Sequence, residues 1–160
     1  MRRGEPRTAR CACPQRQLGL AVGLRCLIVD DNPGFLQTAR KILEDGGITV
    51  IGAVSTSTEA VSQAARAKPD VALVDVVLGA ESGFDLARQL APPAGRPGQP
   101  GDRRPQVIII STHAAEDFAD LIEVSPAIGF LPKWELSAPA VLALLRAAPQ
   151  GQPGDRKSVV

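Results

Sequence analysis

Five short apolar segments recur between residues 24 and 131 of the chain. Each is apolar at successive positions rather than at alternate ones, a pattern typical of parallel strands that are covered on both faces of a sheet. We therefore predict strands at LRCLIV (24–29), ITVIGA (48–53), VALVD (71–75), VIIIS (107–111) and AIGFL (127–131).

Each predicted strand is followed by a segment with the apolar spacing of a helix. In residues 34–45 the apolar positions fall at steps of one, three and four, and Pro33 stands where a first-turn proline is tolerated. Residues 55–67 begin with Thr56 and Glu59, which are three positions apart as in a capping box. Three further helices are predicted at 83–91, 114–124 and 137–148.

Strand and helix alternate five times, which predicts an α/β fold: a doubly wound, five-stranded parallel sheet with right-handed crossovers and helices on both faces. We expect one domain over residues 24–148, with a Pro/Gly-rich loop insertion at 91–105 that is longer than most connections. Residues 149–160 are expected to be a disordered tail. Residues 1–23 are either a disordered basic tail or the product of an upstream start codon, with translation beginning nearer Val22.

Composition narrows the class of protein. The 160 residues are 44% hydrophobic, which is enough for one domain with a sizeable core. The net charge is +1, but residues 1–23 carry five Arg and one Glu, so residues 24–160 hold 13 basic and 16 acidic side chains. This acidic balance argues against nucleic acid as the main partner. Three cysteines fit a reducing cytoplasm, and no apolar run approaches the roughly 20 residues of a membrane span.

Polar side chains stand at the carboxyl ends of four predicted strands. Asp30 and Asp31 follow the first strand, Asp75 ends the third, Ser111 ends the fourth and Lys133 follows the fifth. Ligands of an open parallel sheet bind outside the carboxyl ends of its strands. We therefore expect three carboxylates, a hydroxyl and an ammonium group to converge on one edge.

Carboxylates this close would raise one another's pKa values unless a positive charge intervened. Mg²⁺ is the natural occupant, because it is held by one or two carboxylates and keeps water and phosphate oxygens as its other ligands. A carboxylate surrounded by a metal ion, a lysine and a hydroxyl is equipped to accept a phosphoryl group as an acyl phosphate.

Five motifs occur in order, each at a predicted strand end: LIVDDNP, KPDVALVD, LGAESG, VIIIS and GFLPK. Over Leu24 to about Ala148 the chain resembles the receiver domain of bacterial two-component response regulators. The resemblance implies a flavodoxin-like (βα)5 fold. It also implies that Asp75 is the phosphoacceptor, and that Asp30, Asp31 and Asp75 bind Mg²⁺ together with the backbone carbonyl of Val77.

The resemblance further implies a phosphorylation switch. Ser111 would hydrogen-bond one phosphoryl oxygen and Lys133 would pair with another, while Phe130 occupies the aromatic switch position. In the family, phosphorylation draws the hydroxyl inward and the aromatic ring follows, which reshapes the face formed by the fourth helix, fifth strand and fifth helix.

The function implied is that of a single-domain response regulator, not an enzyme. It would take a phosphoryl group from a sensor histidine kinase or a relay phosphotransfer protein, and signal by phosphorylation-dependent contact with a downstream protein. Residues 149–160 are too few for a helix-turn-helix motif, so we expect no direct DNA binding. We also expect a cytoplasmic protein that does not contact membrane.

Simpler interpretations of single residues stay open. Asp75, Asp30 or Asp31 could cap the helices that follow them. Phe130 could be a core residue. His113 is interpreted as an exposed loop residue rather than a phosphodonor, since donor histidines in these systems come from a partner's helix.

Three positions depart from the commoner family pattern. Trp134 follows Lys133, and Thr112 follows Ser111, and both departures leave open a pseudo-receiver that acts as a constitutive interaction module. Val77 stands where a phosphohydrolase with an aspartyl nucleophile carries its general acid, which argues against that enzyme. The same apolar side chain predicts a long-lived aspartyl phosphate, because it cannot assist the hydrolytic water.

Overall fold

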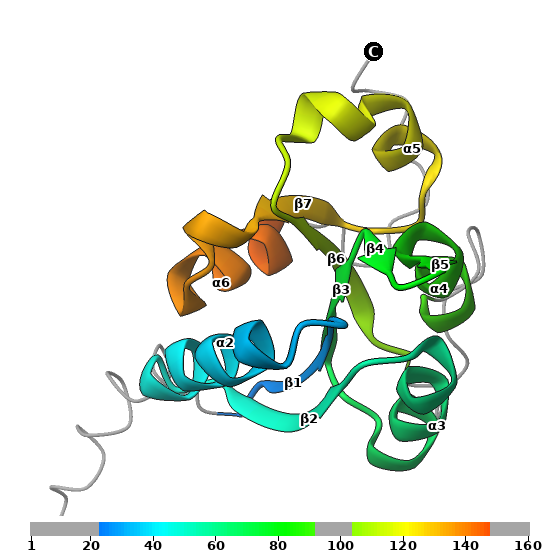
Figure 1. Ribbon diagram of the computed structural model, residues 1–160. Helices are drawn as coiled ribbons and strands as arrows, with labels where there is room; N and C mark the ends of the chain where they lie inside the picture. Colours follow the sequence, from blue (N-terminus) through cyan, green and yellow to red (C-terminus); the bar gives the residue numbers. More distant parts are fainter. Residues whose placement is uncertain (1–22, 92–103, 148–160) are drawn as a thin grey trace, which may run out of the picture.

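A central parallel sheet runs through the computed structural model, which describes residues 23–91 and 104–147 (Figure 1). Its five strands follow the spatial order β2-β1-β3-β6-β7. Their bounds are Arg25–Val29 (β1), Thr49–Val54 (β2), Val71–Asp75 (β3), Gln106–Ser111 (β6) and Gly129–Pro132 (β7). The direction of winding reverses between β1 and β3, so the predicted flavodoxin-like, doubly wound α/β fold is confirmed.

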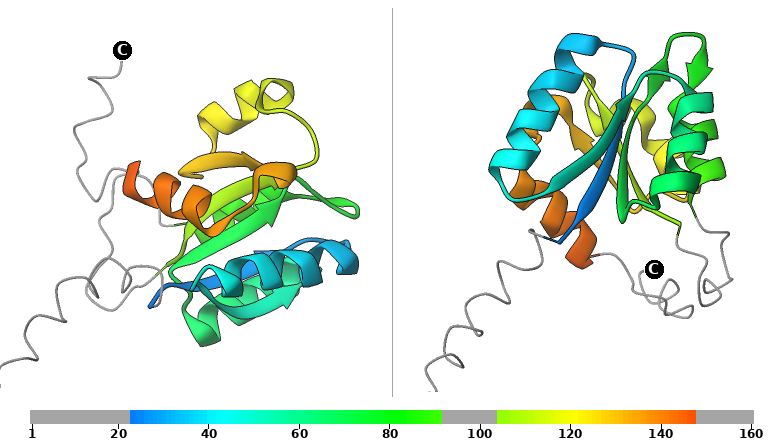
Figure 2. Two further views of the ribbon diagram at one scale, coloured as in Figure 1. Left: turned by 90° about the vertical axis from the view of Figure 1, so that its left-hand side faces the viewer. Right: turned by 90° about the horizontal axis from the view of Figure 1, so that it is seen from below.

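Helices cover both faces of this sheet (Figures 1 and 2). One face carries α2 (Pro33–Asp45) and α6 (Ala138–Ala147), and the other carries α3 (Ser57–Ala67), α4 (Gly83–Leu90) and α5 (Ala119–Val124). Two short 3₁₀ helices, η1 (Ala115–Phe118) and η2 (Lys133–Glu135), follow β6 and β7. In the described part of the chain, no helix combines the length and the apolar character needed to cross a membrane.

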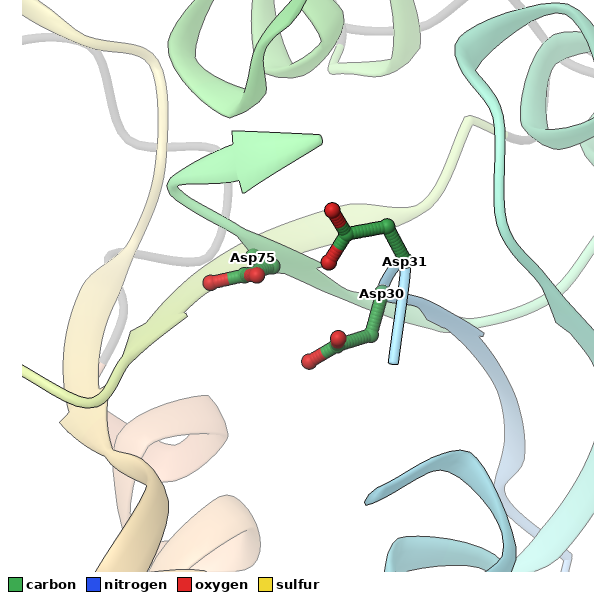
Figure 3. Close-up of side chains that lie close together, drawn as sticks. All are labelled: Asp30, Asp31 and Asp75. Atoms are coloured by element: carbon green, nitrogen blue, oxygen red, sulfur yellow. The ribbon is translucent and has the colours of Figure 1, made fainter. Parts of the chain in front are cut away.

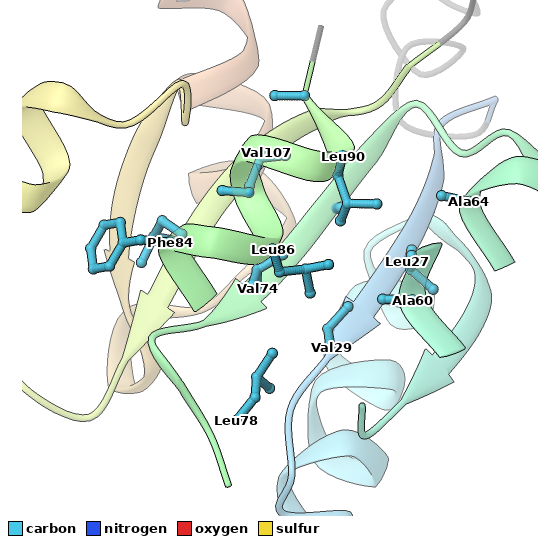
Figure 4. Close-up of a cluster of buried hydrophobic side chains, with 14 of the residues drawn as sticks. Leu27, Val29, Ala60, Ala64, Val74, Leu78, Phe84, Leu86, Leu90 and Val107 are labelled. Atoms are coloured by element: carbon cyan, nitrogen blue, oxygen red, sulfur yellow. The ribbon is translucent and has the colours of Figure 1, made fainter. Parts of the chain in front are cut away.

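Successive side chains of the central strands enter two separate apolar layers. In β1, Leu27 and Val29 belong to the layer under α3 and α4, whereas Cys26 and Ile28 belong to the layer under α2 and α6. Figure 4 shows the first of these layers. Because both sides of the sheet are covered, the strands are apolar at successive positions over most of their length, as the sequence pattern indicates.

Side-chain caps fix where the first two of these helices begin. The Asn32 side chain accepts hydrogen bonds from the backbone N–H groups of Gly34 and Phe35 at the start of α2. At the start of α3, the Thr56 hydroxyl oxygen accepts from the Glu59 N–H at 3.2 Å, and the Glu59 carboxylate accepts from the Thr56 hydroxyl. The predicted capping pair of α3 is therefore confirmed.

A hairpin that the sequence pattern does not predict lies between β3 and α4. Its strands, β4 (Val77–Leu78) and β5 (Glu81–Ser82), pair antiparallel. Only two residues separate them, and one of these, Gly79, has a φ of +61° that favours glycine. The hairpin follows directly from the end of β3 and so reaches the edge where the candidate site residues stand.

The predicted helix over 114–124 is confirmed only over Ala119–Val124, which form α5. The first part of the segment is instead the 3₁₀ turn η1, whose last residue, Phe118, has a φ of −128° that breaks the regular helix. The Phe118 ring packs against the rings of Phe84 and Phe130, with centroids 6.3 Å away in both cases. The Phe118 side chain is thus packed between these rings at the point where the regular helix is interrupted.

The predicted tails and most of the predicted insertion at 91–105 lie outside the described residues. Their disorder and the outer limits of the domain therefore stay predictions.

Candidate functional site

The register of the sheet determines which predicted site residues meet. Strands β1 and β3 run in register, so Asp30, which follows β1, lies beside Asp75, the last residue of β3. On the other side of β3, strand β6 ends in Ser111, one register step beyond Asp75. Strand β7 pairs with the end of β6 through Pro132, and Lys133 comes next. All four side chains are thus delivered to one edge.

Three carboxylates share this edge (Figure 3). Asp30, Asp31 and Asp75 each offer an oxygen that lies within 4.8 Å of the oxygens of the other two. Asp30 is fully buried and Asp75 is 7% exposed, whereas Asp31 is exposed. The cluster therefore has a buried inner side and one carboxylate at the surface.

Lys133 brings a positive charge into the cluster. Its Nζ forms an ion pair with Oδ2 of Asp30 and lies 3.3 Å from Oδ2 of Asp75. The ammonium group also lies 4.5 Å from the centroid of the Phe35 ring, within the range of a cation–π contact. Lys133 is therefore held between two carboxylates and an aromatic face.

Burial raises the pKa of Asp75 above the ordinary value of an aspartate. Loss of hydration is the largest cause, and the negative charge of Asp30 acts in the same direction, with a smaller effect from Asp31. The charge and hydrogen bond of Lys133 lower the pKa but do not offset the other effects. The predicted repulsion between carboxylates does raise the pKa of Asp75, but it ranks behind desolvation.

Backbone N–H groups orient two of the carboxylates. Oδ1 of Asp30 accepts from the N–H of Asn32 at 2.8 Å, and Oδ2 of Asp31 accepts from the N–H of Gly79 at 3.0 Å. Gly79 lies in the turn of the β4–β5 hairpin. Because one oxygen of each carboxylate is fixed by the backbone, the direction of its other oxygen is fixed as well.

Ser111 ends β6 with a buried side chain. Its hydroxyl oxygen accepts a hydrogen bond from the N–H of His113 at 3.0 Å, which tightens the turn after the strand. His113 itself is exposed, as the sequence analysis expects of a loop residue. The hydroxyl therefore stands on the strand next to Asp75, in a position set by local backbone.

Phe130 lies at the border of the core. Its ring is half-buried, packs against the apolar layer under α3 and α4, and faces the Phe118 ring at a centroid distance of 6.3 Å. Phe118 in turn contacts Phe84 and the edge of the His113 ring. Phe130 thus belongs to an aromatic cluster of three rings packed around Phe118, one of which is His113, whose N–H donates to Ser111. This position is compatible with a core role and with a switch role.

The donor set fits a hard divalent cation. Three carboxylates face one lysine in a largely buried space, so full ionisation is costly unless further positive charge is present. Carboxylate oxygens are the ligands that Mg²⁺ prefers. Val77, predicted to add its backbone carbonyl, begins β4 two residues after Asp75, and its side chain is 55% exposed.

Three residues that support the cluster, Asn32, Gly79 and Phe35, were not predicted from the sequence. Asn32 is visible in the sequence as a capping residue before a first-turn proline. The contacts of Gly79 and Phe35 depend on tertiary structure and leave no local signal. The alternative that Asp75 or the Asp30 pair caps a helix is wrong, because Asn32 caps α2 and Ser82 caps α4.

We expect the thermal stability of the metal-free protein to depend on how many of the carboxylates in the cluster are charged. Asp75→Asn removes one of three like charges and should raise the Tm at neutral pH by a few degrees. Since the pKa of Asp75 is raised by folding, the stability contributed by its protonated form is present below about pH 3.8 and is lost as the pH rises through the raised value. The advantage of Asp75→Asn should therefore disappear in acid.

Lys133→Met is the opposing variant. It leaves the fully buried Asp30 without its ion-pair partner, which should cost about 3–5 kcal/mol of unfolding free energy. Thermal unfolding in the presence of a chelator measures both variants. A lower Tm for Asp75→Asn than for the wild type at neutral pH would contradict the charge balance described for the cluster.

Comparison with known proteins identifies the family to which the chain belongs. The model of the response regulator receiver domain matches residues 26–143. Protein PilH of Pseudomonas aeruginosa is 36% identical over 92 residues, which are 58% of this chain and 70% of that protein. Among solved structures, the signal receiver domain of a modulated diguanylate cyclase from Desulfovibrio desulfuricans is 28% identical with a TM-score of 0.60, covering 85% of this chain and 98% of that one.

Other curated relatives are much longer than the matched region. A protein-glutamate methylesterase/protein-glutamine glutaminase of Hahella chejuensis is 41% identical over 64 residues, which are 40% of this chain and 18% of that protein. The chain spans 56% and 24% of the next two relatives. The similarity therefore concerns the receiver module that these proteins share. The chain belongs to the response regulator receiver domain family, a family of signalling modules of two-component systems.

Proposed function

We propose that the chain is a phosphoacceptor that receives a phosphoryl group on Asp75 in a Mg²⁺-dependent reaction. The observation that carries the proposal is the meeting of three carboxylates with Lys133 at the edge of the sheet. Membership of the receiver family supports it. The donor is a phosphohistidine of a sensor kinase or of a relay phosphotransfer protein.

In the transfer, the bond between phosphorus and the donor's histidine nitrogen breaks while a bond forms between phosphorus and a carboxylate oxygen of Asp75. The nitrogen keeps the electron pair, so the donor leaves as a free imidazole. Asp30, Asp31 and Asp75, together with the carbonyl of Val77, would hold Mg²⁺, which when bound would supply positive charge to the phosphoryl oxygens. The burial of Asp75 keeps bulk water from its carboxylate.

Lys133 and Ser111 would stabilise the product. The Lys133 ammonium already lies 3.3 Å from an oxygen of Asp75, so it is close enough to form an ion pair with a phosphoryl group attached to that side chain. The Ser111 hydroxyl is on the adjoining strand and is held by the His113 N–H. A move of this hydroxyl toward the phosphoryl group would release that contact and bring Ser111 closer to Asp75.

The change at the phosphorylated site would be transmitted by the aromatic cluster around Phe118. Phe130 contacts Phe118, and Phe118 contacts both Phe84 and His113. A shift of Ser111 and of the loop behind it would change this packing, and with it the exposed face of η1 and α5. The proposed output is contact with a downstream protein in the cytoplasm, with no enzymatic activity and no direct binding of DNA or membrane.

We expect incubation with Mg²⁺ and acetyl phosphate to add the mass of one phosphoryl group to the intact protein. Asp75→Asn should gain no mass, because the acceptor oxygen is lost, and a chelator should prevent the gain in the wild type. Intact-mass spectrometry measures both. A folded wild-type chain that gains no mass from this donor or from a phosphorylated histidine protein would favour the alternative of a pseudo-receiver.

We expect the aspartyl phosphate to be long-lived. Val77 presents an exposed apolar side chain two residues after Asp75, where a polar group could orient the attacking water. Val77→Asn supplies such a group at the same exposed position and should shorten the lifetime. Decay of the phosphorylated mass after removal of the donor measures the rate, and loss within seconds from the wild type would count against this role of Val77.

A further inference from the structure

A hydrogen bond ties the β4–β5 hairpin to the start of α3. Oε1 of Glu81 accepts from the backbone N–H of Ser57 at 3.2 Å, across 24 positions of sequence. Ser57 is the first residue of α3, and the first N–H groups of a helix have no partner within it. The capping pair Thr56 and Glu59 satisfies a different group, the N–H of Glu59. Glu81 therefore adds to the cap of α3 from another element.

The hairpin is held at two further points, and one of them is a carboxylate of the cluster. Leu78 is buried in the apolar layer under α3 and α4 (Figure 4), and the N–H of Gly79 donates to Asp31 at 3.0 Å. The hairpin ends at Ser82, and at the next residue, Gly83, a Cβ would come within 1.9 Å of the carbonyl oxygen of Asp75. The hairpin is thus a physical link between Asp31 and Asp75.

We propose that Glu81 is a positioning residue of the cation site. By holding the hairpin against α3, it keeps the Gly79 N–H on Oδ2 of Asp31, and so directs the other oxygen of Asp31 toward Asp30 and Asp75. Glu81 stands opposite Leu78 in the hairpin, next to the turn that contains Gly79, so the tether acts directly on that turn. This role deepens the proposed function, on which it rests in taking the three carboxylates as the cation site.

Isothermal titration calorimetry of the full chain with Mg²⁺ alone tests the role. Glu81→Ala removes the acceptor and should raise the Kd for Mg²⁺ about threefold to tenfold. Loss of a group that directly contacts a metal-binding side chain typically weakens metal affinity by roughly 10- to 100-fold. The effect of Glu81→Ala should be smaller, because Glu81 acts on Asp31 only through Gly79. Glu81→Gln keeps an acceptor oxygen and should bind with nearly wild-type affinity.

Glu123→Ala is the matched control. It removes the same charge from an exposed position on α5 and should leave the Kd unchanged. Equal weakening by Glu81→Gln and Glu81→Ala would assign the effect to charge and overturn the positioning role.

Ser57→Pro tests the same hydrogen bond from the donor side. Proline is tolerated at the first helical position, and Thr56 already has the extended backbone that a residue before proline requires, with φ −130° and ψ 158°. Ser57→Pro should raise the Kd as Glu81→Ala does. The double variant should be no weaker than either single one, because all three lack the same bond.

Wild-type affinity in Glu81→Ala and in Ser57→Pro would overturn the positioning role alone. Absence of Mg²⁺ binding by the wild-type chain would overturn the proposed cation site and the positioning role together. The two failures are therefore distinguishable in one set of titrations, and thermal unfolding of each variant shows whether it is folded at the temperature of the measurement.

Discussion

The gathering of three carboxylates at one edge of the sheet is the constraint on which the rest of the structure depends. Like charges within 4.8 Å of one another repel, and burial of Asp30 and Asp75 removes the water that would screen them. One lysine offsets part of this cost. The fold must therefore supply enough stability elsewhere to hold the groups together, and a cation or a phosphoryl group then finds them already in place.

Two apolar layers and a set of backbone donors meet this requirement. The layers fix the strands, so that register alone sets Asp30 beside Asp75. Backbone N–H groups of Asn32 and Gly79 then fix the direction of the carboxylates of Asp30 and Asp31. Preorganisation of this kind lowers the cost of binding, because little conformational freedom remains to be lost when the ligand arrives.

The strands, the helix order and the residues at the edge could be predicted from the sequence for a physical reason. Strands buried on both faces leave a continuous apolar run, and polar residues at the ends of such runs stand out. Asp75 closes its strand in this way. The hairpin after β3 could not be predicted, because its strands have two residues each and its position depends on contacts with Asp31 and Ser57 far away in sequence.

The break in the helix at Phe118 is a second feature that the local sequence does not predict. The segment 114–124 has helical spacing, but its backbone leaves the regular helix at Phe118, whose ring packs against Phe84 and Phe130. The local sequence pattern predicts a helix or strand correctly where burial and intrinsic propensity agree. It does not predict the backbone where tertiary contacts oppose that propensity.

The most direct test of the account is to find which residue carries the phosphoryl group. Borohydride reduces an aspartyl phosphate to homoserine, and peptide mass spectrometry of the reduced protein then locates the changed residue. We expect homoserine at position 75 after incubation with Mg²⁺ and a phosphodonor, and at no other aspartate. Homoserine at position 30 or 31, or an acid-labile phosphoryl group on His113, would contradict it.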